Sequence, residues 1–463
     1  MFIYTRSSFS FYLLSFIYCS IIIPCLTIEL DLYLHTISKS TSITSKLYID
    51  NDFYYLIPIC LGTPPQCVDV LYETNFTHLM MNPSPLVDLN DPFDTQKSST
   101  FRSEQHVLAF FNIQGDIVYD KLQICLDTFD YSFLYNNYLS IETRYKEFDG
   151  VFGFGKSYDD KDIFFNRTFS LIELLYQQKK IPSKIFGHRY FENRNYLRLF
   201  IGEITDDDYI DKYVKKKNTF PKCDCREASE MLGKMSHNQL SQIWSCMLNK
   251  AIIFQEGNET ILYEMNKINI PVIFSTGSNL IRGPFEYGKQ IFDYILNLPQ
   301  YKDKCKKITY GKNKLNIICS WTIDIYNFPK IKFDVGGATL IAHPYNYLYK
   351  EYDSIGDKFV FKGRFEFGND LKFWSFGQSV LREYDMIFDM ENEYVGFWNI
   401  DKEPWNRSEF LGVVGWISFG LVMVVLGTLG VIWFLRWKNW HSPLKQKERM
   451  MYNKIEKLKD MEA

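Results

Sequence analysis

The chain has 463 residues, which is long enough for two domains of ordinary size, each with its own core. It carries 52 Lys and Arg against 55 Asp and Glu, a formal net charge of −3. This balance lacks the basic excess that nucleic-acid binding requires, so we expect no nucleic-acid partner.

The N-terminus predicts entry into the secretory pathway. Residues 9–26 are apolar, follow Arg6 and precede the first acidic residue, Glu29. A basic start followed by such a run is typical of a signal peptide. We therefore predict a signal peptide over residues 1–27, cleaved near Thr27. The alternative is an uncleaved anchor at the same place.

The next part of the chain carries an ordered set of short motifs. Residues 54–59 and 68–72 are short alternating segments, typical of strands, on either side of the turn LGTPPQ at 61–66. The triplet Glu-Thr-Asn follows at 73–75, and FDGVFGFG follows at 148–155.

The same plan returns in the second half of the chain. Residues 275–277 read Ser-Thr-Gly, LIRGP follows at 280–284, and WSFGQ stands at 374–378. Over residues 50–400 these motifs, in this order, resemble the pepsin-like aspartic peptidases, in which each triplet reads Asp-Thr-Gly. A fold resemblance of this kind does not by itself establish activity.

The resemblance implies a fold class and a set of boundaries. It predicts an all-β bilobal fold of the pepsin-like type with minor α structure. The N-terminal lobe would span residues 51–204 and the C-terminal lobe residues 241–400. Between them, the charge-rich segment 205–240 would hold the inter-lobe connection and an insertion.

The resemblance also assigns the candidate catalytic positions. Glu73 and Ser275 stand where the family has its two aspartates. The positions that support them are Thr74, Asn75, Thr276 and Gly277. In the family the two threonines bond across the lobes, so we expect the two triplets to face each other. Glu73 and Ser275 would then lie roughly 3–5 Å apart.

These substitutions argue against the family's chemistry. That chemistry uses two carboxylates about 3 Å apart that share a proton and activate a water. Glu73 keeps a carboxylate but adds a methylene, and a misplacement of ~1 Å can lower the rate ~100-fold. Ser275 has a hydroxyl, which does not ionise near neutral pH. His78 lies near Glu73 in the sequence, but we interpret it as an ordinary polar side chain.

A short segment precedes the first lobe. The stretch 28–38 within residues 28–50 resembles the strand that begins the family's inhibitory propeptide. The alternative is that this strand belongs to the mature sheet.

The cysteines predict disulfides. Eight of the ten lie beyond the signal segment, and an even count in a secreted chain favours pairing. Cys60 and Cys67 flank the turn at 61–66 and can face each other across a hairpin. Cys305 and Cys319 resemble the family's C-lobe disulfide. The remaining four leave three pairings open: Cys125, Cys223, Cys225 and Cys246.

We expect no metal and no cofactor. Cys223, Cys225, His237 and Cys246 are zinc-ligand types, but their spacing matches no standard site.

N-glycosylation sequons occur four times. Asn166 and Asn258 are predicted surface acceptors, whereas Asn406 lies close to the expected membrane. Asn75 would lie in the cleft, and we expect it to be unmodified.

The C-terminus predicts a membrane anchor. Residues 410–435 contain no charge and are long enough to cross a bilayer. The tail 436–463 has eight Lys and Arg against four Asp and Glu, which predicts a cytosolic tail and an external ectodomain.

Two functions remain open from the sequence. The favoured one is a type I membrane glycoprotein with an inactive pepsin-like ectodomain that binds a peptide or protein. The alternative is a divergent endopeptidase that retains weak proteolysis through Glu73 and Ser275.

Overall fold

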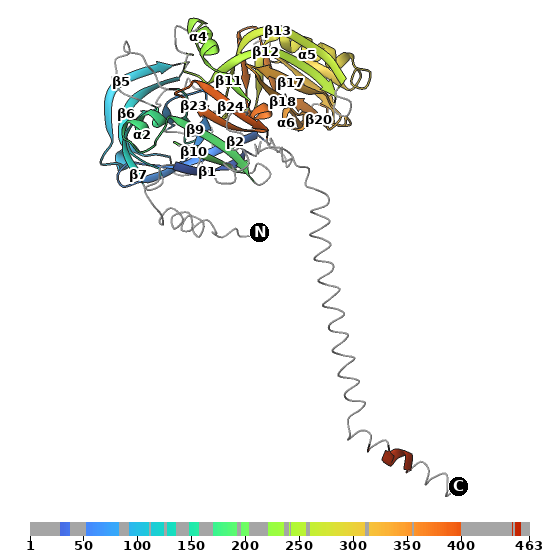
Figure 1. Cartoon of the computed structure of the whole chain (residues 1–463), viewed down its shortest axis with the longest axis horizontal. Coiled ribbons are helices and arrows are strands. Elements are labelled where there is room, and N and C mark those ends of the chain that lie inside the picture. Colours follow the sequence, from blue (N-terminus) through green and yellow to red (C-terminus); the bar gives the residue numbers. More distant parts are fainter. Residues whose placement is uncertain are drawn as a thin grey trace. The chain divides into compact units, whose positions relative to one another are not determined.

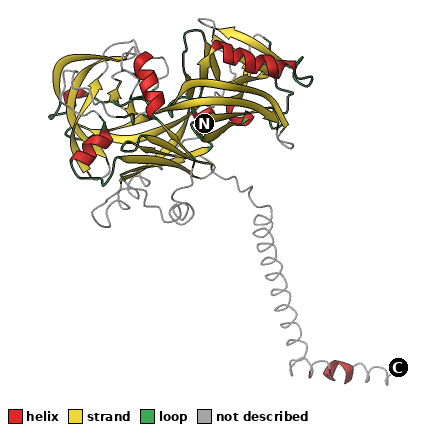
Figure 2. Cartoon of the chain, turned by 45° about the horizontal axis from the view of Figure 1, so that its top comes forward, coloured by secondary structure: helices red, strands yellow, loops and turns green. Residues whose placement is uncertain are grey.

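The computed structural model describes most of the chain between residues 28 and 399 and a few residues near the C-terminus (Figure 1). The described residues are 28–37, 52–82, 92–110, 113–124, 127–135, 148–156, 170–191, 196–202, 221–235, 240, 242–255, 260–310, 314–353, 356–399, 447 and 450–454. Strands dominate the part up to residue 399 (Figure 2).

The strands of this part form two large sheets. The first has the order β11-β24-β23-β9-β10-β1-β2-β3-β8-β4-β7-β6-β5. Its strands are β1 (Ile28–Ile37), β2 (Asp52–Leu61), β3 (Gln66–Glu73), β4 (Leu79–Met81), β5 (Arg102–Phe110), β6 (Ile113–Ile124), β7 (Asp127–Tyr135), β8 (Gly150–Gly153), β9 (Ile185–Phe191), β10 (Tyr196–Ile201), β11 (Lys222–Asp224), β23 (Tyr384–Asp389) and β24 (Tyr394–Asn399).

The second sheet has the order β18-β17-β12-β13-β22-β14-β21-β16-β20-β19, and β15 pairs with β16. Its strands are β12 (Ser245–Gln255), β13 (Thr260–Phe274), β14 (Ile281–Pro284), β15 (Cys305–Tyr310), β16 (Lys314–Ser320), β17 (Lys330–Val335), β18 (Ala338–Ala342), β19 (Leu348–Asp353), β20 (Lys358–Gly363), β21 (Phe365–Gly368) and β22 (Trp374–Phe376).

The helices described are few and short. They are η1 (Thr95–Lys97), α2 (Leu171–Gln177), α4 (Arg226–Met235), α5 (Phe285–Asn297), α6 (Pro344–Tyr347) and α7 (Gln378–Leu381). The α5 helix buries Gly288, Ile291, Phe292 and Ile295, a spacing that gives one apolar face. The predicted mostly-β fold with minor α structure is confirmed.

The two sheets contain the same local arrangement, which confirms the predicted duplication. β3 pairs in parallel with β8, and β8 pairs antiparallel with β4. In the second sheet β13 pairs in parallel with β22, and β22 pairs antiparallel with β14. β4 and β14 then pair in parallel with β7 and β21. Each triplet stands at the end of the first strand of its arrangement, since Glu73 is the last residue of β3 and Ser275 follows β13.

Strands from residues 185–224 pair with strands from residues 384–399 in the first sheet. β9 pairs with β23, so that His188 lies opposite Met386, and β11 pairs with β24. The rings of Phe186 and Phe388 stack across this junction with centroids 4.6 Å apart. The segment predicted as a connection, 205–240, therefore also supplies β11 and α4.

The strand predicted within residues 28–50 is β1. It lies between β10 and β2 and pairs antiparallel with both. It is thus an internal strand of the first sheet.

The hairpin of β2 and β3 confirms one local prediction. Leu61 lies opposite Gln66, and Cys60 lies opposite Cys67 with a disulfide between them. Gly62 begins the turn at φ 85°, a left-handed conformation that favours glycine. A Cβ at this position would also stand 2.8 Å from Ser98 Oγ.

Two further disulfides are present among the described residues. Cys305–Cys319 joins β15 to β16, as predicted. Cys223–Cys246 is one of the pairings that the sequence left open, and Cys225 keeps a buried free thiol. Cys125 and His237 lie outside the described residues.

Three other predicted features also fall outside the described residues: the signal segment 1–27, the sequons at Asn166, Asn258 and Asn406, and the span 410–435. Within the portions that are described, no helix is both long and apolar enough to cross a membrane. Residues 450–454 are helical and exposed.

Candidate active site

The two triplets lie at the ends of equivalent strands and face each other. Glu73 is the last residue of β3, and Ser275 comes directly after β13. Backbone hydrogen bonds join each of these residues to the neighbouring parallel strand or to the residue that follows it: Phe154 N, directly after β8, donates to Glu73 O, and Ser275 N donates to Phe376 O of β22. The duplicated arrangement thus holds the two side chains on opposed loops.

The threonines of the triplets join these loops. Thr74 Oγ1 donates to Phe274 O at 2.8 Å, and Thr276 Oγ1 donates to Tyr72 O at 3.1 Å. Thr276 N also donates to Thr74 Oγ1 at 3.3 Å. Both threonines are fully buried. The predicted link between the lobes is therefore present.

Glu73 is fully buried, and donors converge on its carboxylate. Oε1 accepts from Thr74 N at 2.9 Å and from Asn75 N at 3.1 Å. Oε2 accepts from the Ser275 hydroxyl at 3.1 Å. This separation confirms the predicted contact, and hydrogen bonding offsets the desolvation that burial of a carboxylate requires.

Asn75 completes the polar centre. Its Nδ2 donates to Ser275 Oγ at 3.1 Å, so the serine hydroxyl accepts from Asn75 while it donates to Glu73. N-glycosylation would attach to this same Nδ2. The bond across the lobes agrees with the expectation that the sequon at Asn75 stays unmodified.

Gly277 makes room for the longer carboxylate. A Cβ at this position would stand 2.7 Å from Glu73 Oε2 and 3.0 Å from Leu71 Cδ2. The family's glycine is thus required here for a steric reason that the sequence alone did not reveal.

A buried polar network lies behind the triplets. Tyr72 Oη and His188 Nδ1 are 3.2 Å apart. Tyr190 Oη donates to Gln378 Oε1 at 3.0 Å, and Gln378 Nε2 donates to Thr276 O at 2.7 Å. Gln378 therefore positions the second triplet through its backbone. These residues are too far apart in the sequence for any motif to connect them.

Burial governs the ionisation of this network. It raises the pKa of Tyr72, with a smaller contribution from Glu73, and it raises the pKa of Tyr190. It lowers the pKa of His188 from 6.5 to about 3. The network is therefore uncharged near neutral pH.

His78 is also buried, and burial lowers its pKa to about 4. Its ring lies 5.6 Å from that of Phe76. This packing agrees with the interpretation of His78 as a non-catalytic side chain.

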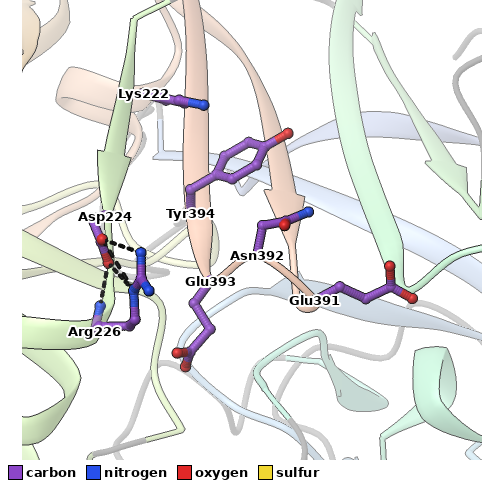
Figure 3. A pocket seen from close by; sticks show the side chains of 7 residues that line it. All are labelled: Lys222, Asp224, Arg226, Glu391, Asn392, Glu393 and Tyr394. Atoms are coloured by element: carbon purple, nitrogen blue, oxygen red, sulfur yellow. Dashed lines mark hydrogen bonds and ion pairs between the residues drawn. The ribbon is translucent and has the colours of Figure 1, made fainter.

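A surface pocket of about 520 Å³ lies elsewhere, between β11 and the turn before β24 (Figure 3). Its lining residues are Lys222, Asp224, Arg226, Glu391, Asn392, Glu393 and Tyr394. Arg226 forms a bidentate pair with Asp224, which lowers the pKa of that carboxyl. The lining mixes charges of both signs and includes no residue of either triplet.

Comparison with known proteins agrees with the fold. A sequence model of the eukaryotic aspartyl protease family matches residues 54–400, most of the chain. The chain belongs to this family.

Two curated relatives illustrate the likeness. Cathepsin D of Mus musculus is 23% identical over 400 residues, covering 78% of this chain and 84% of the mouse protein. Cathepsin D of Rattus norvegicus is 23% identical over 382 residues, covering 76% and 81%.

Proposed function

We propose that this protein is a membrane-anchored, catalytically inactive aspartic-peptidase homologue that binds an extended peptide or protein segment. The observation that carries the proposal is the polar centre itself. Ser275 supplies a hydroxyl at the position of the second carboxylate, and that hydroxyl bonds both Glu73 and Asn75.

The loss of activity follows from the chemistry of the pair. One carboxylate has to act as a base while its neighbour, protonated, polarises the peptide carbonyl. Ser275 cannot alternate between these two forms near neutral pH. Glu73 is fully buried and Ser275 is 1% exposed, so neither side chain offers a surface to an attacking water.

Retention of the scaffold supports binding. The threonine link and the duplicated strand arrangement preserve two opposed lobes around the triplets. A site between two β-lobes suits an extended peptide held by backbone hydrogen bonds, as in strand addition. The secretory and membrane assignments rest on residues 1–27 and 410–435 and on the basic tail.

One contact favours a second candidate, weak proteolysis through Glu73 and Ser275. The hydroxyl donates to the carboxylate at 3.1 Å, which is the arrangement of a nucleophile beside its base. In this candidate the hydroxyl activated in this way attacks the peptide carbonyl directly.

Incubation of the purified protein with a diverse peptide library from pH 3 to 7 separates the two candidates. We expect no cleavage that is sensitive to pepstatin at any pH. The matched variants are Glu73→Ala and Glu391→Ala, the latter in the surface pocket away from the triplets. Reproducible cleavage that Glu73→Ala abolishes and Glu391→Ala preserves would establish the second candidate.

A binding measurement tests the proposal itself. Peptides retained by the wild-type protein are titrated against Asn75→Phe, which places a bulky ring beside Ser275. The control is Asn392→Phe, in the surface pocket. We expect at least a ~10-fold loss of affinity for Asn75→Phe alone, since the ring would overpack the space beside Ser275. Equal affinities for both variants would place the binding surface elsewhere.

A further inference from the structure

Three buried cysteines gather beneath the surface pocket. Cys223 lies on β11, Cys225 comes directly before α4, and Cys246 is the second residue of β12. All three are fully buried, and their sulfur atoms lie within 4.8 Å of one another. Cys223 and Cys246 form a disulfide, and the Cys225 thiol is free.

Strand geometry places two of these sulfurs on one side. Successive side chains of an extended segment alternate between its faces, so Cys223 and Cys225 both point inward. Lys222, Asp224 and Arg226 alternate with them and line the pocket instead (Figure 3). The burial of these residues alternates in the same way, with the cysteines buried and their neighbours exposed. Cys246 therefore faces two sulfurs of one segment.

The free thiol is within reach of the disulfide. Cys225 Sγ lies 3.9 Å from Cys246 Sγ, which is contact distance for two sulfur atoms. A thiolate exchanges with a disulfide by attacking one of its sulfurs. The attack needs no external partner here, because both reactants are already side by side.

A buried lysine stands beside the thiol. Burial raises the pKa of Cys225 to about 12. The charge of Lys156 lowers this pKa, whereas the charges of Asp224 and Glu393 raise it. Lys156 Nζ donates to Ser229 Oγ at 2.5 Å and lies 3.9 Å from Glu393 Oε1. Burial lowers the pKa of Lys156, so a larger fraction of its amine is neutral at a given pH than in an exposed lysine, and only the neutral amine can take up a proton.

We propose that Cys223, Cys225 and Cys246 form a disulfide-exchange centre in which Cys246 alternates between two partners. The Cys225 sulfur loses its proton and attacks Cys246 Sγ. A Cys225–Cys246 bond forms, the Cys223–Cys246 bond breaks, and the departing Cys223 sulfur takes up a proton. No electron is gained or lost overall, and each form holds one disulfide and one thiol.

The two forms close loops of nearly equal length. Cys223 and Cys246 are 23 residues apart in the sequence, and Cys225 and Cys246 are 21 apart. The entropy of the unfolded chain therefore hardly distinguishes the two forms. Local packing decides between them, and exchange moves the free thiol from the start of α4 to the strand that lines the pocket.

The test replaces the resident partner in the full-length protein. In Cys223→Ser we expect Cys225 to bond Cys246, so the denatured, unreduced protein has one free thiol fewer than the wild type. The control is Cys305→Ser, which should have one free thiol more, because the described residues place no third cysteine at that disulfide. A Cys223→Ser protein with one free thiol more than the wild type, or with zinc held by its cysteines, overturns the proposal.

Peptide mapping of the wild type provides a second measurement that needs no variant. Cleavage on the amino side of Asp224 separates Cys223 from Cys225. After incubation of the folded protein at pH 8, alkylation and acid quenching, we expect peptides that link Cys246 to each of the two cysteines. Linkage to Cys223 alone would contradict exchange.

Discussion

The buried His188 should make stability depend on pH. Its imidazole is fully buried among the rings of Tyr72, Tyr190 and Phe388. Burial lowers its pKa from 6.5 to about 3. On acidification, His188 therefore becomes protonated at a higher pH in the unfolded chain than in the folded protein. The stability that the neutral imidazole contributes is complete above pH 6.5 and is lost as the pH falls from 6.5 towards 3.

The magnitude follows from the pH interval. A pH of 5 lies about 1.5 units below the pKa of His188 in the unfolded chain and above its pKa in the folded protein. At about 1.4 kcal/mol per unit, His188 then removes about 2 kcal/mol from the free energy of unfolding relative to pH 7. His188→Gln keeps an acceptor for the Tyr72 hydroxyl but does not titrate. The variant should therefore escape this loss.

Urea unfolding at pH 7 and pH 5 measures the effect. The free energy of unfolding of His188→Gln, relative to the wild type, should rise by about 2 kcal/mol between pH 7 and pH 5. Tyr72→Phe is the control, since it removes the bond to His188 but leaves the imidazole in place. If the free energies of unfolding of His188→Gln and the wild type differ by the same amount at pH 7 and pH 5, the assignment of a neutral, buried imidazole is refuted.

Three further predictions concern the lobes, the anchor and the glycans. Thr276→Val should lower the free energy of unfolding by about 1–3 kcal/mol, because a buried backbone carbonyl loses its donor. Thr339→Val, at an exposed position of β18, should hardly change the free energy of unfolding. Equal losses of stability in the two variants would count against the threonine link. Protease added to intact cells should remove the ectodomain and spare a tag at Ala463. Digestion of the tag would contradict the predicted orientation, in which the C-terminal tail is cytosolic. Enzymatic deglycosylation followed by mass spectrometry should mark Asn166 and Asn258 but not Asn75. A glycan on Asn75 would be incompatible with its bond to Ser275.

Much of this protein could be predicted from short segments of its sequence. The turn at 61–66 predicted the hairpin and the Cys60–Cys67 pair, because residues a few positions apart settle both. The order of the motifs predicted the duplicated lobes and the opposition of Glu73 to Ser275. These inferences succeeded because each motif encodes its own local backbone, and the fold class fixes how the copies combine.

The tertiary structure alone decided the contacts between distant segments. Asn75 meets Ser275 across 200 positions of sequence, and Gly277 leaves the space that the Glu73 carboxylate fills. The choice of Cys223 over Cys225 as the partner of Cys246 likewise depended on how β11 and β12 pack. A sequence pattern records which groups are available. Whether two of them touch depends on distances of a few ångströms that only the packed chain sets, because hydrogen bonds and disulfides form only at close range.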